Sequence, residues 1–496
     1  MKRTLPLLAL SILSSTHLSH ADTAEQKPNI IVVISDDQGY ADMGCSGYAK
    51  PDVKTPHLDK LASEGTRFTQ AYSSAPICNA SRAGLITGVY QARMGVYWYK
   101  NPGLKEGRFQ TIPEALKKAG YSTGYVGKVH YGSGALDSRD FPTNHGFDYY
   151  FGFMGGRKHY LHHSDADEAR FLELQKKAGR KTDNPVARKG GVTKFESLKM
   201  GGMWENKTKV NTQGLATEIF GAKARAFISK NKEKPFYLQL SFNAVHNFTH
   251  QLPEAYKKAH GITGLVKDWD PAKEEYLDWY RKARFPNNPE GRASYLGHLH
   301  FLDQEIGKLS KHLADLGLTK NTLLIYVSDN GGSTPIYADN TPLRGSKYTL
   351  YEGGIRIPMI VRWPGHAPAE TITHAVVSTL DIFPTICKAA GVTSTNKFDG
   401  NNLSGLLARQ RPSSPERTLY WDSGHEHAVR SGNWKYHVVT DAKDADLEMV
   451  KLVKGEFLYD LQSDPGEIIN IANKNPDKLE EMREIYQAWK KQMPVR

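Results

Sequence analysis

The feature that most constrains the fold of this chain is a series of short apolar segments separated by helical patterns. Asn29 to Ser35 is a continuous apolar run, which is typical of a strand buried on both faces. Similar strand-like segments follow at Tyr121 to Val126, Phe236 to Phe242 and Asn321 to Val327. Strands that alternate with helices predict an α/β fold, in which helices cover both faces of a large, mostly parallel sheet.

Helix signals lie between these strand-like segments. A helix is predicted to begin at Thr55-Pro56, where threonine suits the cap and proline the first helical position, and to end at Gly65. A capping box that starts at Thr111 begins a second helix, which Gly120 ends just before the next strand. The helices therefore fall where a parallel sheet needs its connections.

Polar side chains follow each of the four strand-like segments, at the point where the segment ends. These residues are Asp36, Asp37, Lys128, His130, His246, Asp329 and Asn330. In open α/β sheets, ligands bind beyond the carboxyl ends of the strands. We therefore expect groups from distant parts of the sequence to converge on one edge of the sheet and to form a single active site.

Four of these residues, Asp36, Asp37, Asp329 and Asn330, form a set of oxygen ligands. Three carboxylates and an amide carbonyl suit Ca²⁺, and the lack of a Cys/His cluster argues against structural zinc. Taken singly, an Asp-Asp pair can cap a helix and an Asn-Gly pair commonly forms a turn. Their joint position at two strand ends favours a metal site.

One segment resembles a known modification signature. Residues 78–82 read Cys-Asn-Ala-Ser-Arg, and a Leu-Ile-Thr-Gly run follows at 85–88. This segment resembles the signature of the formylglycine-dependent sulfatases, the type I sulfatases of the alkaline phosphatase superfamily. Four further blocks stand in the family's order: Asn29 to Asp37, Gly127 to His130, Ser328 to Gly332 and Leu343 to Gly354. Bacterial polysaccharide sulfatases, including carrageenan sulfatases, look most similar.

The resemblance implies an alkaline-phosphatase-like fold and two cofactors. Cys78 would be oxidised by a formylglycine-generating maturation enzyme to formylglycine (3-oxoalanine), whose hydrated diol attacks sulfur. The modified residue would bind Ca²⁺ together with Asp36, Asp37, Asp329 and Asn330. A thiolate suits so hard an ion poorly, which favours the oxygen-bearing diol.

Several residues are expected around the diol. If a helix begins near Cys78, Arg82 lies about one turn away on the same face and can donate to the diol oxygens. The resemblance implies Lys128 and His130 on this side, where His130 would remove the proton that lets the sulfated hemiacetal collapse. Asp329 would assist deprotonation of the attacking hydroxyl.

On the leaving-group side, the resemblance implies His246 and Lys347, which would supply an acid for the departing alcohol. The sequence departs from the family here, because members often have Pro-His-x-Pro around the histidine, and His250 competes with His246. Many members also carry proline where this chain has Ala80, which leaves open which maturation system acts.

No motif places the residues that contact the rest of the substrate. The candidates are Arg157, His159, His162, His163, His250 and Arg344. Most of them lie in or near the segment from Arg157 to Lys209, which is polar and weakly periodic. We interpret this segment as insertions over the site.

The chain is predicted to have three parts. Residues 1–21 resemble a secretory signal peptide, with a basic start, a short apolar run and small residues at its end. Residues 22–410 would form the catalytic domain, and residues 411–496 a C-terminal subdomain of short antiparallel strands and a final helix. No apolar stretch is long enough to span a bilayer. We therefore expect a periplasmic or secreted protein without a membrane anchor.

The formal net charge of +12 favours a polyanionic partner. No basic helix, zinc spacing or aromatic RNA-binding motif supports nucleic acid, and a sulfated carbohydrate such as a carrageenan-type galactan fits export better. A solvated basic surface is the alternative reading of the charge. The alternative functions are a phosphonate or phosphate ester hydrolase of the same superfamily and a glycan-binding pseudosulfatase. Whether Cys45 and Cys387 pair stays open.

Overall fold

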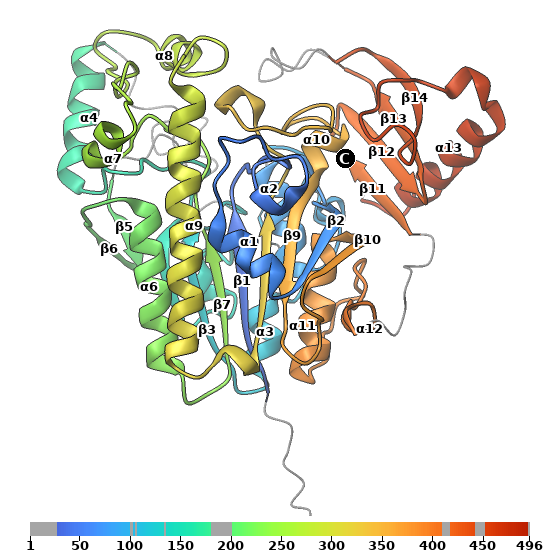
Figure 1. Cartoon of the computed structure of the whole chain (residues 1–496), viewed down its shortest axis with the longest axis horizontal. Coiled ribbons are helices and arrows are strands. Elements are labelled where there is room, and N and C mark those ends of the chain that lie inside the picture. Colours follow the sequence, from blue (N-terminus) through green and yellow to red (C-terminus); the bar gives the residue numbers. More distant parts are fainter. Residues whose placement is uncertain are drawn as a thin grey trace, which may run out of the picture.

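The computed structural model describes residues 27–99, 103–104, 107–132, 135–179, 201–408, 417–441 and 452–494. Its centre is a ten-stranded sheet in the order β10-β2-β9-β8-β1-β7-β3-β4-β5-β6 (Figure 1). The strands span Asn29–Ser35 (β1), Thr66–Tyr72 (β2), Ser122–Lys128 (β3), Tyr149–Phe153 (β4), Met203–Glu205 (β5), Thr208–Val210 (β6), Phe236–Ser241 (β7), Thr322–Ser328 (β8), Arg356–Arg362 (β9) and Thr371–Ser378 (β10).

The middle of this sheet is parallel. Strand β1 pairs in parallel with β7 and β8, and β3 pairs in parallel with β7 and β4. Ile34 near the end of β1 stands opposite Ser241 of β7 and Val327 of β8, so the carboxyl ends of these strands are level. Antiparallel pairing is found around β9, which runs against β8 and β2, and at the β4-β5-β6 edge. The prediction of a large, mostly parallel sheet is confirmed.

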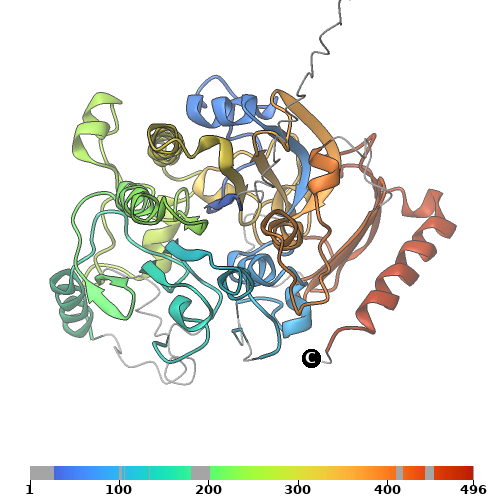
Figure 2. The ribbon, with the colours of Figure 1, turned by 90° about the horizontal axis from the view of Figure 1, so that it is seen from below.

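Helices cover both faces of the sheet, as the buried pattern of β1 predicts. Every residue of β1 is buried, and alternate residues pack into two different hydrophobic clusters. Ile30 and Val32 pack with residues of α2 (Cys78–Thr87), α3 (Ile112–Lys117) and α11 (Ile382–Ala390). Ile31 and Val33 pack with residues of α1 (Pro56–Ser63), α6 (Ala216–Asn231) and α9 (Gly291–Asp315). Seen end-on, helices lie on both sides of the sheet (Figure 2). The other α-helices that the structure describes in this large unit are α4 (Asp165–Lys177), α7 (Glu254–Ala259), α8 (Tyr276–Ala283), α10 (Glu352–Ile355) and α12 (Ser404–Leu407).

A second, four-stranded antiparallel sheet follows in the sequence and lies beside the large sheet in Figure 1, with α13 (Pro476–Lys490) on its outer side. Its strands are β11 (Thr418–Asp422), β12 (Glu426–Ser431), β13 (Trp434–Val439) and β14 (Gly455–Asp460), paired in sequence order. Met482, Tyr486 and Trp489 of α13 pack on Tyr436 and Val438 of β13. The short strands and the final helix predicted for this part of the chain are confirmed.

The boundaries predicted from local sequence signals agree with the structure to within a few residues. Helix α1 begins at Pro56, and α3 has the capping box formed by Thr111 and Glu114. The predicted signal peptide, residues 1–21, lies outside the described residues, as do residues 409–416, around the predicted boundary between the catalytic domain and the C-terminal subdomain. Of the helices that the structure describes, none is long and apolar enough to cross a membrane.

Candidate active site

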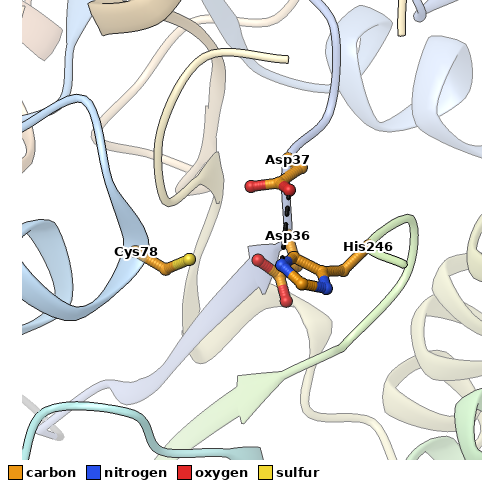
Figure 3. A group of neighbouring side chains, drawn as sticks. All are labelled: Asp36, Asp37, Cys78 and His246. Carbon is orange, nitrogen blue, oxygen red and sulfur yellow. Dashed lines mark ion pairs between the residues drawn. The ribbon is translucent and has the colours of Figure 1, made fainter. Parts of the chain in front are cut away.

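The polar residues predicted to converge do meet at one edge of the sheet. Asp36 and Asp37 follow β1, Asp329 follows β8, and His246 follows β7. In Figure 3 the side chains of Asp36, Asp37 and His246 approach Cys78, which comes from the start of α2. Ligand atoms of these four residues lie within 4.8 Å of one another. Three strands and one helix therefore build this site from residues far apart in the sequence.

Cys78 is the first residue of α2 and is buried. Its thiol Sγ accepts a hydrogen bond from Lys347 Nζ at 3.2 Å. Burial raises the pKa of the Cys78 thiol, and the nearby Lys128 and Lys347 only partly oppose this effect. The unmodified side chain is therefore a protonated thiol. The start of a helix nevertheless favours negative charge, because its first backbone N–H groups have no partner within the helix.

Arg82 lies one turn further along α2 and fixes the helix against the sheet. Its Nε donates to Asp329 Oδ2 at 2.8 Å, and its Nη1 donates to the carbonyl of Lys128 at 3.0 Å and to the Ser241 hydroxyl. Gly127 permits this arrangement, since a Cβ there would lie 1.8 Å from the Ser241 carbonyl oxygen. The guanidinium thus links α2 to the ends of β3, β7 and β8.

Lys347, on the other side of Cys78, contacts three groups of the site. Its buried Nζ lies 2.8 Å from Asp37 Oδ2 and 3.1 Å from His246 Nε2, besides its contact with the thiol. Burial opposes the charge of Lys347, but Asp37 and Cys78 raise its pKa well above the usual value. Burial, together with Lys347 and Lys128, lowers the pKa of His246 well below its usual value. The pair therefore consists of a charged lysine and a neutral histidine.

Asp36, at the end of β1, forms an ion pair with Lys128. Burial raises the pKa of Asp36 to about 8, and Lys128 only partly opposes the shift. Burial also disfavours ionisation of Asp329, but Arg82 and Lys128 lower its pKa below the usual value. Carboxylates this deeply buried need cations close by to stay ionised.

Two buried oxygens test whether the site fits a metal ion. Asp36 Oδ1 and Asn330 Oδ1 are buried and have no hydrogen-bond partner among the described residues. Asn330 donates through Nδ2 to Asp37 Oδ1 at 2.8 Å, which orients its amide. Unpartnered buried acceptors are costly, and a hard cation would satisfy both oxygens. The predicted oxygen ligands therefore fit Ca²⁺.

The backbone around the site is strained. Asp37, His130, Phe248 and Tyr348 all have positive φ angles, of 61°, 55°, 74° and 78°. Residues with side chains adopt this conformation rarely, and such strain concentrates at functional sites. His130 packs against Gly156, where an added Cβ would lie 2.6 Å from the imidazole ring. His130 also contributes to the lowered pKa of His246, for which burial is the main cause, so the two histidines interact.

The competition between His246 and His250 is resolved by their positions. His246 contacts Lys347, whereas His250 Nε2 lies 2.8 Å from Asp268 Oδ1. His162 Nε2 lies 2.9 Å from Asp268 Oδ2, and the side-chain amide of Gln251 bridges Asp268 and Nδ1 of His159. His159, His162 and His250 therefore belong to a separate cluster around the Asp268 carboxylate, whose oxygens these hydrogen bonds satisfy.

The three remaining substrate-contact candidates, His163, Arg344 and Arg157, have contacts of different kinds. His163 is buried, and its Nε2 lies 3.0 Å from the carbonyl of His159. Arg344 donates to the carbonyl of Glu467 at 2.9 Å and stacks over Tyr351, with its guanidinium 4.2 Å from the ring centroid. Arg344 thus connects a loop of the large sheet to a loop of the C-terminal sheet and does not belong to the Cys78 site. Arg157 donates to the Tyr276 hydroxyl at 2.7 Å and, after burial and the two lysines, contributes to the lowered pKa of His246.

Two residues of this region, Ser241 and Tyr348, were not predicted from the sequence. Ser241 ends β7 and holds Arg82, and the rule that polar residues at strand ends are functional could have identified it. Tyr348 follows Lys347 directly, and its ring centroid lies 5.2 Å from the Lys347 ammonium. No sequence signal predicts that contact. The three cysteines, Cys45, Cys78 and Cys387, are free thiols, which settles the open question of pairing.

Comparisons with known proteins agree with this geometry. A family model described as Sulfatase matches residues 28–392. A second, described as N-sulphoglucosamine sulphohydrolase, C-terminal, matches residues 346–494. The chain is 29% identical to an N-acetylgalactosamine-6-O-sulfatase of Bacteroides thetaiotaomicron, over 94% of this chain and 93% of the relative.

Two further similarities extend over nearly the whole chain. The chain is 30% identical to arylsulfatase A of Bos taurus, over 93% of this chain and 87% of the relative. The crystal structure of Ps i-CgsB in complex with k-i-k-neocarrahexaose superposes with a TM-score of 0.73 at 28% identity. That superposition covers 94% of this chain and 93% of the neighbour.

Proposed function

The chain belongs to the sulfatase family and is a sulfuric ester hydrolase, and we propose that it uses a formylglycine made from Cys78, with Ca²⁺, to remove sulfate from a sulfated carbohydrate. The observation that carries the proposal is the environment of Cys78. Its thiol lies at the start of α2, beside Lys347 and within 4.8 Å of ligand atoms of Asp36 and Asp37. A buried thiol gains nothing from so many charges, whereas an oxygen nucleophile that approaches an anion needs them.

The two groups that the structure does not contain would supply distinct chemistry. Formylglycine supplies an oxygen nucleophile that can be regenerated, and Ca²⁺ supplies positive charge that polarises a sulfate oxygen. Asp36, Asp37, Asp329 and Asn330 would hold the ion, as the two unpartnered buried oxygens of Asp36 and Asn330 support.

The basic residues of the site orient the start of α2 and neutralise negative charge beside Cys78. Arg82 is fixed by Asp329, the Lys128 carbonyl and Ser241, so it holds the start of α2 in one orientation. Lys128 and Lys347 bring two ammonium groups to the sides of Cys78, where a sulfate group carries its negative charge. Fixed cations of this kind act where charge develops, without needing to reorganise.

Proton transfer is assigned to the two histidines. His246 accepts a hydrogen bond from the charged Lys347, so the pair can deliver a proton to the oxygen of the departing sugar. His130, with its strained backbone and its position against Gly156, would take the proton whose loss releases sulfate. The role of His246 is supported by its hydrogen bond from Lys347, whereas the role of His130 is supported by its backbone conformation and its position against Gly156.

The substrate class is inferred from the relatives and from charge. One relative is named for a 6-sulfated N-acetylgalactosamine, and a structural neighbour was solved with k-i-k-neocarrahexaose. The net charge of +12 favours a polyanion. We infer a sulfated polysaccharide or its oligosaccharides, with a carrageenan-type galactan as the leading candidate. Export through the predicted signal peptide and maturation of Cys78 by a formylglycine-generating enzyme belong to the same proposal.

The test is release of inorganic product from defined esters. Purified protein should release sulfate from sulfated galactan and N-acetylgalactosamine oligosaccharides, and from a nitrophenyl sulfate, faster than it releases phosphate from matched phosphate and phosphonate esters. Faster phosphate or phosphonate release would favour the superfamily alternative. Binding of the oligosaccharides without any sulfate release, in protein whose Cys78 stays an unmodified thiol even when it is produced with the maturation enzyme, would favour a pseudosulfatase.

A further inference from the structure

Arg157 is a cation that lies next to the Cys78 site, where it contributes, after burial and the two lysines, to the lowered pKa of His246. It follows β4 at the same edge of the sheet as the catalytic residues and is half-buried. Among the residues that the structure describes, no carboxylate forms an ion pair with it, and its guanidinium donates to the Tyr276 hydroxyl. By contrast, the buried arginines Arg82 and Arg417 are each paired with an aspartate. A guanidinium left without a counter-charge in a partly dry site attracts an anion.

Aromatic side chains surround this guanidinium on two sides. Tyr276 and Tyr280 of α8 stack with ring centroids 5.8 Å apart, and the Arg157 guanidinium lies 5.4 Å from the Tyr276 centroid. Trp98, Tyr99 and Tyr348 form the second group. Tyr276 is the main cause of a pKa of Arg157 above its usual value, against the effect of burial, and Tyr348, Tyr99 and Tyr280 add to it, so all four tyrosines lie near the guanidinium.

The second group connects Arg157 to the catalytic centre. Tyr99 lies 5.5 Å from Trp98 and 6.0 Å from Tyr348, measured between ring centroids. Tyr348 follows Lys347 and is held in a strained conformation by its backbone hydrogen bond to Pro76, two residues before Cys78. Trp98, Tyr99 and Tyr348 are all partly exposed, so part of each ring is available to a ligand.

We propose that Arg157 and these aromatic rings form a second anion subsite, which binds another negatively charged group of the same substrate. The rings would pack on the apolar faces of a sugar, and the guanidinium would pair with a sulfate or carboxylate on that sugar. This inference rests on the proposed sulfatase function. It narrows the substrate to glycans with a second anionic group close to the sulfate that is removed.

The experiment compares substrates that share one scissile sulfate. The set comprises an oligosaccharide with that sulfate alone, one with a second sulfate on the neighbouring sugar, one with a carboxylate there, and nitrophenyl sulfate. The wild-type protein should prefer at least one of the doubly charged oligosaccharides in kcat/KM. Arg157→Met should reduce that preference about tenfold or more, since a charged hydrogen-bonded pair is lost. The sulfate and carboxylate members show which anion the subsite accepts.

Two further variants separate binding from folding. Arg281→Met is the matched control, because Arg281 lies on the exposed side of α8, the helix that carries Tyr276 and Tyr280, and is paired with Asp278; it should leave the preference unchanged. Tyr99→Ala removes an exposed ring, and it should raise KM for the oligosaccharides more than for nitrophenyl sulfate. Melting temperatures of all variants show whether a loss reflects unfolding.

Three outcomes overturn parts of the account differently. Equal losses on every substrate in folded Arg157→Met would mean that Arg157 acts on the scissile sulfate, and an unchanged preference would mean that it binds no second anion. Either result contradicts the subsite while sulfate release continues to support the proposed function. Absence of sulfate release by wild-type protein with modified Cys78 would instead contradict the proposed function itself.

Discussion

Two buried ionic networks in this molecule use the same residue types for different ends. The active-site network joins Asp36, Asp37 and Asp329 to the basic residues around Cys78. The junction network lies between the two sheets, where the Lys435 ammonium of β13 lies 3.0 Å from Glu352 and 2.8 Å from Glu467. All the charged side chains in both networks are buried. Burial and pairing alone therefore do not identify a catalytic site.

The networks differ in where their contacts lead. In the junction network, Tyr72 of β2 donates to Glu352 at 2.6 Å, and Arg430 of β12 donates in turn to Tyr72, so each group ties one element to another. In the active-site network, Asp36 Oδ1 and Asn330 Oδ1 have no hydrogen-bond partner among the described residues, and the ion pair between Asp36 Oδ1 and Arg82 is 3.8 Å long. In the junction network, Glu467 Oε1 also makes no hydrogen bond, but it lies only 2.8 Å from the Lys435 ammonium. We interpret the junction network as architecture, and the active-site network as a set of groups that awaits ligands.

The largest expected effect is loss of the metal ion. Chelation, or Asp37→Ala, should reduce turnover by about a thousandfold or more, since an electrostatic contact to the developing charge is removed. Adding Ca²⁺ to chelated wild-type protein should restore turnover and raise the melting temperature, by mass action on the folded state. Asp37→Ala should show no such thermal shift. Restoration by Zn²⁺ in preference to Ca²⁺ would contradict the oxygen-ligand argument.

Disruption of the junction network should lower the stability of the protein and leave its turnover unchanged. Lys435→Met leaves Glu352 and Glu467 buried without their shared cation, and should lower the free energy of unfolding by about 3–5 kcal/mol. Denaturant melts measure this loss, and Lys311→Met on the exposed face of α9 is the control. Turnover per folded molecule should stay near wild type. A variant that is fully stable but inactive would erase the distinction between the networks.

The role of His246 is tested by the leaving group. His246→Ala should slow release of sulfate from an oligosaccharide by about 10²–10³-fold, a range expected for loss of a general acid. A nitrophenol leaves without protonation, so nitrophenyl sulfate should recover much of that loss. His130→Ala should not recover in the same way, because its proton transfer follows departure of the alcohol. Equal recovery in both variants would contradict the assignment.

The smallest effect is the pH dependence of the junction. Burial raises the pKa of Glu467 to about 7, with Lys435 opposing and Glu352 adding to the shift. A carboxyl whose pKa is raised on folding stabilises the fold below its unfolded pKa of 4.5, and this contribution is lost as pH rises through about 7. We expect a loss of about 1–3 kcal/mol across that window.

The control for this pH effect is Glu467→Gln, which cannot ionise. Its melting temperature, relative to wild type, should rise between pH 5 and 8 as the wild-type carboxyl becomes charged; these pH values are roughly those that bracket the shift. A difference in melting temperature that stays constant across this pH range would show that Glu467 has the same charge in the folded and unfolded states, and would contradict the raised pKa.

The sequence predicted the sheet and the catalytic edge because both follow from local rules. The buried run of β1, the capping box of α3 and the polar residues at strand ends each have a physical cause within a few neighbouring residues. The resemblance around Cys78 then assigned the roles that strand-end placement leaves open.

Side-chain partners across the sheet were not predictable in the same way. Whether His246 or His250 faces Cys78 depends on the conformation of the loop after β7. Asp268, which forms a hydrogen bond with His250, lies 18 residues further along the chain. Arg344 was a substrate-contact candidate by sequence position, but its guanidinium lies over Tyr351. Such choices depend on tertiary contacts, which no single segment of the sequence encodes.

The most direct test of the account is the mass of the peptide that contains Cys78, measured together with activity. Protein produced with its maturation enzyme should release sulfate, and this peptide should be lighter by about 18 Da, as expected when the thiol is oxidised to the aldehyde. The fraction of modified peptide and the specific activity should rise together across preparations. Full activity in a preparation whose Cys78 remains an intact thiol would contradict the account.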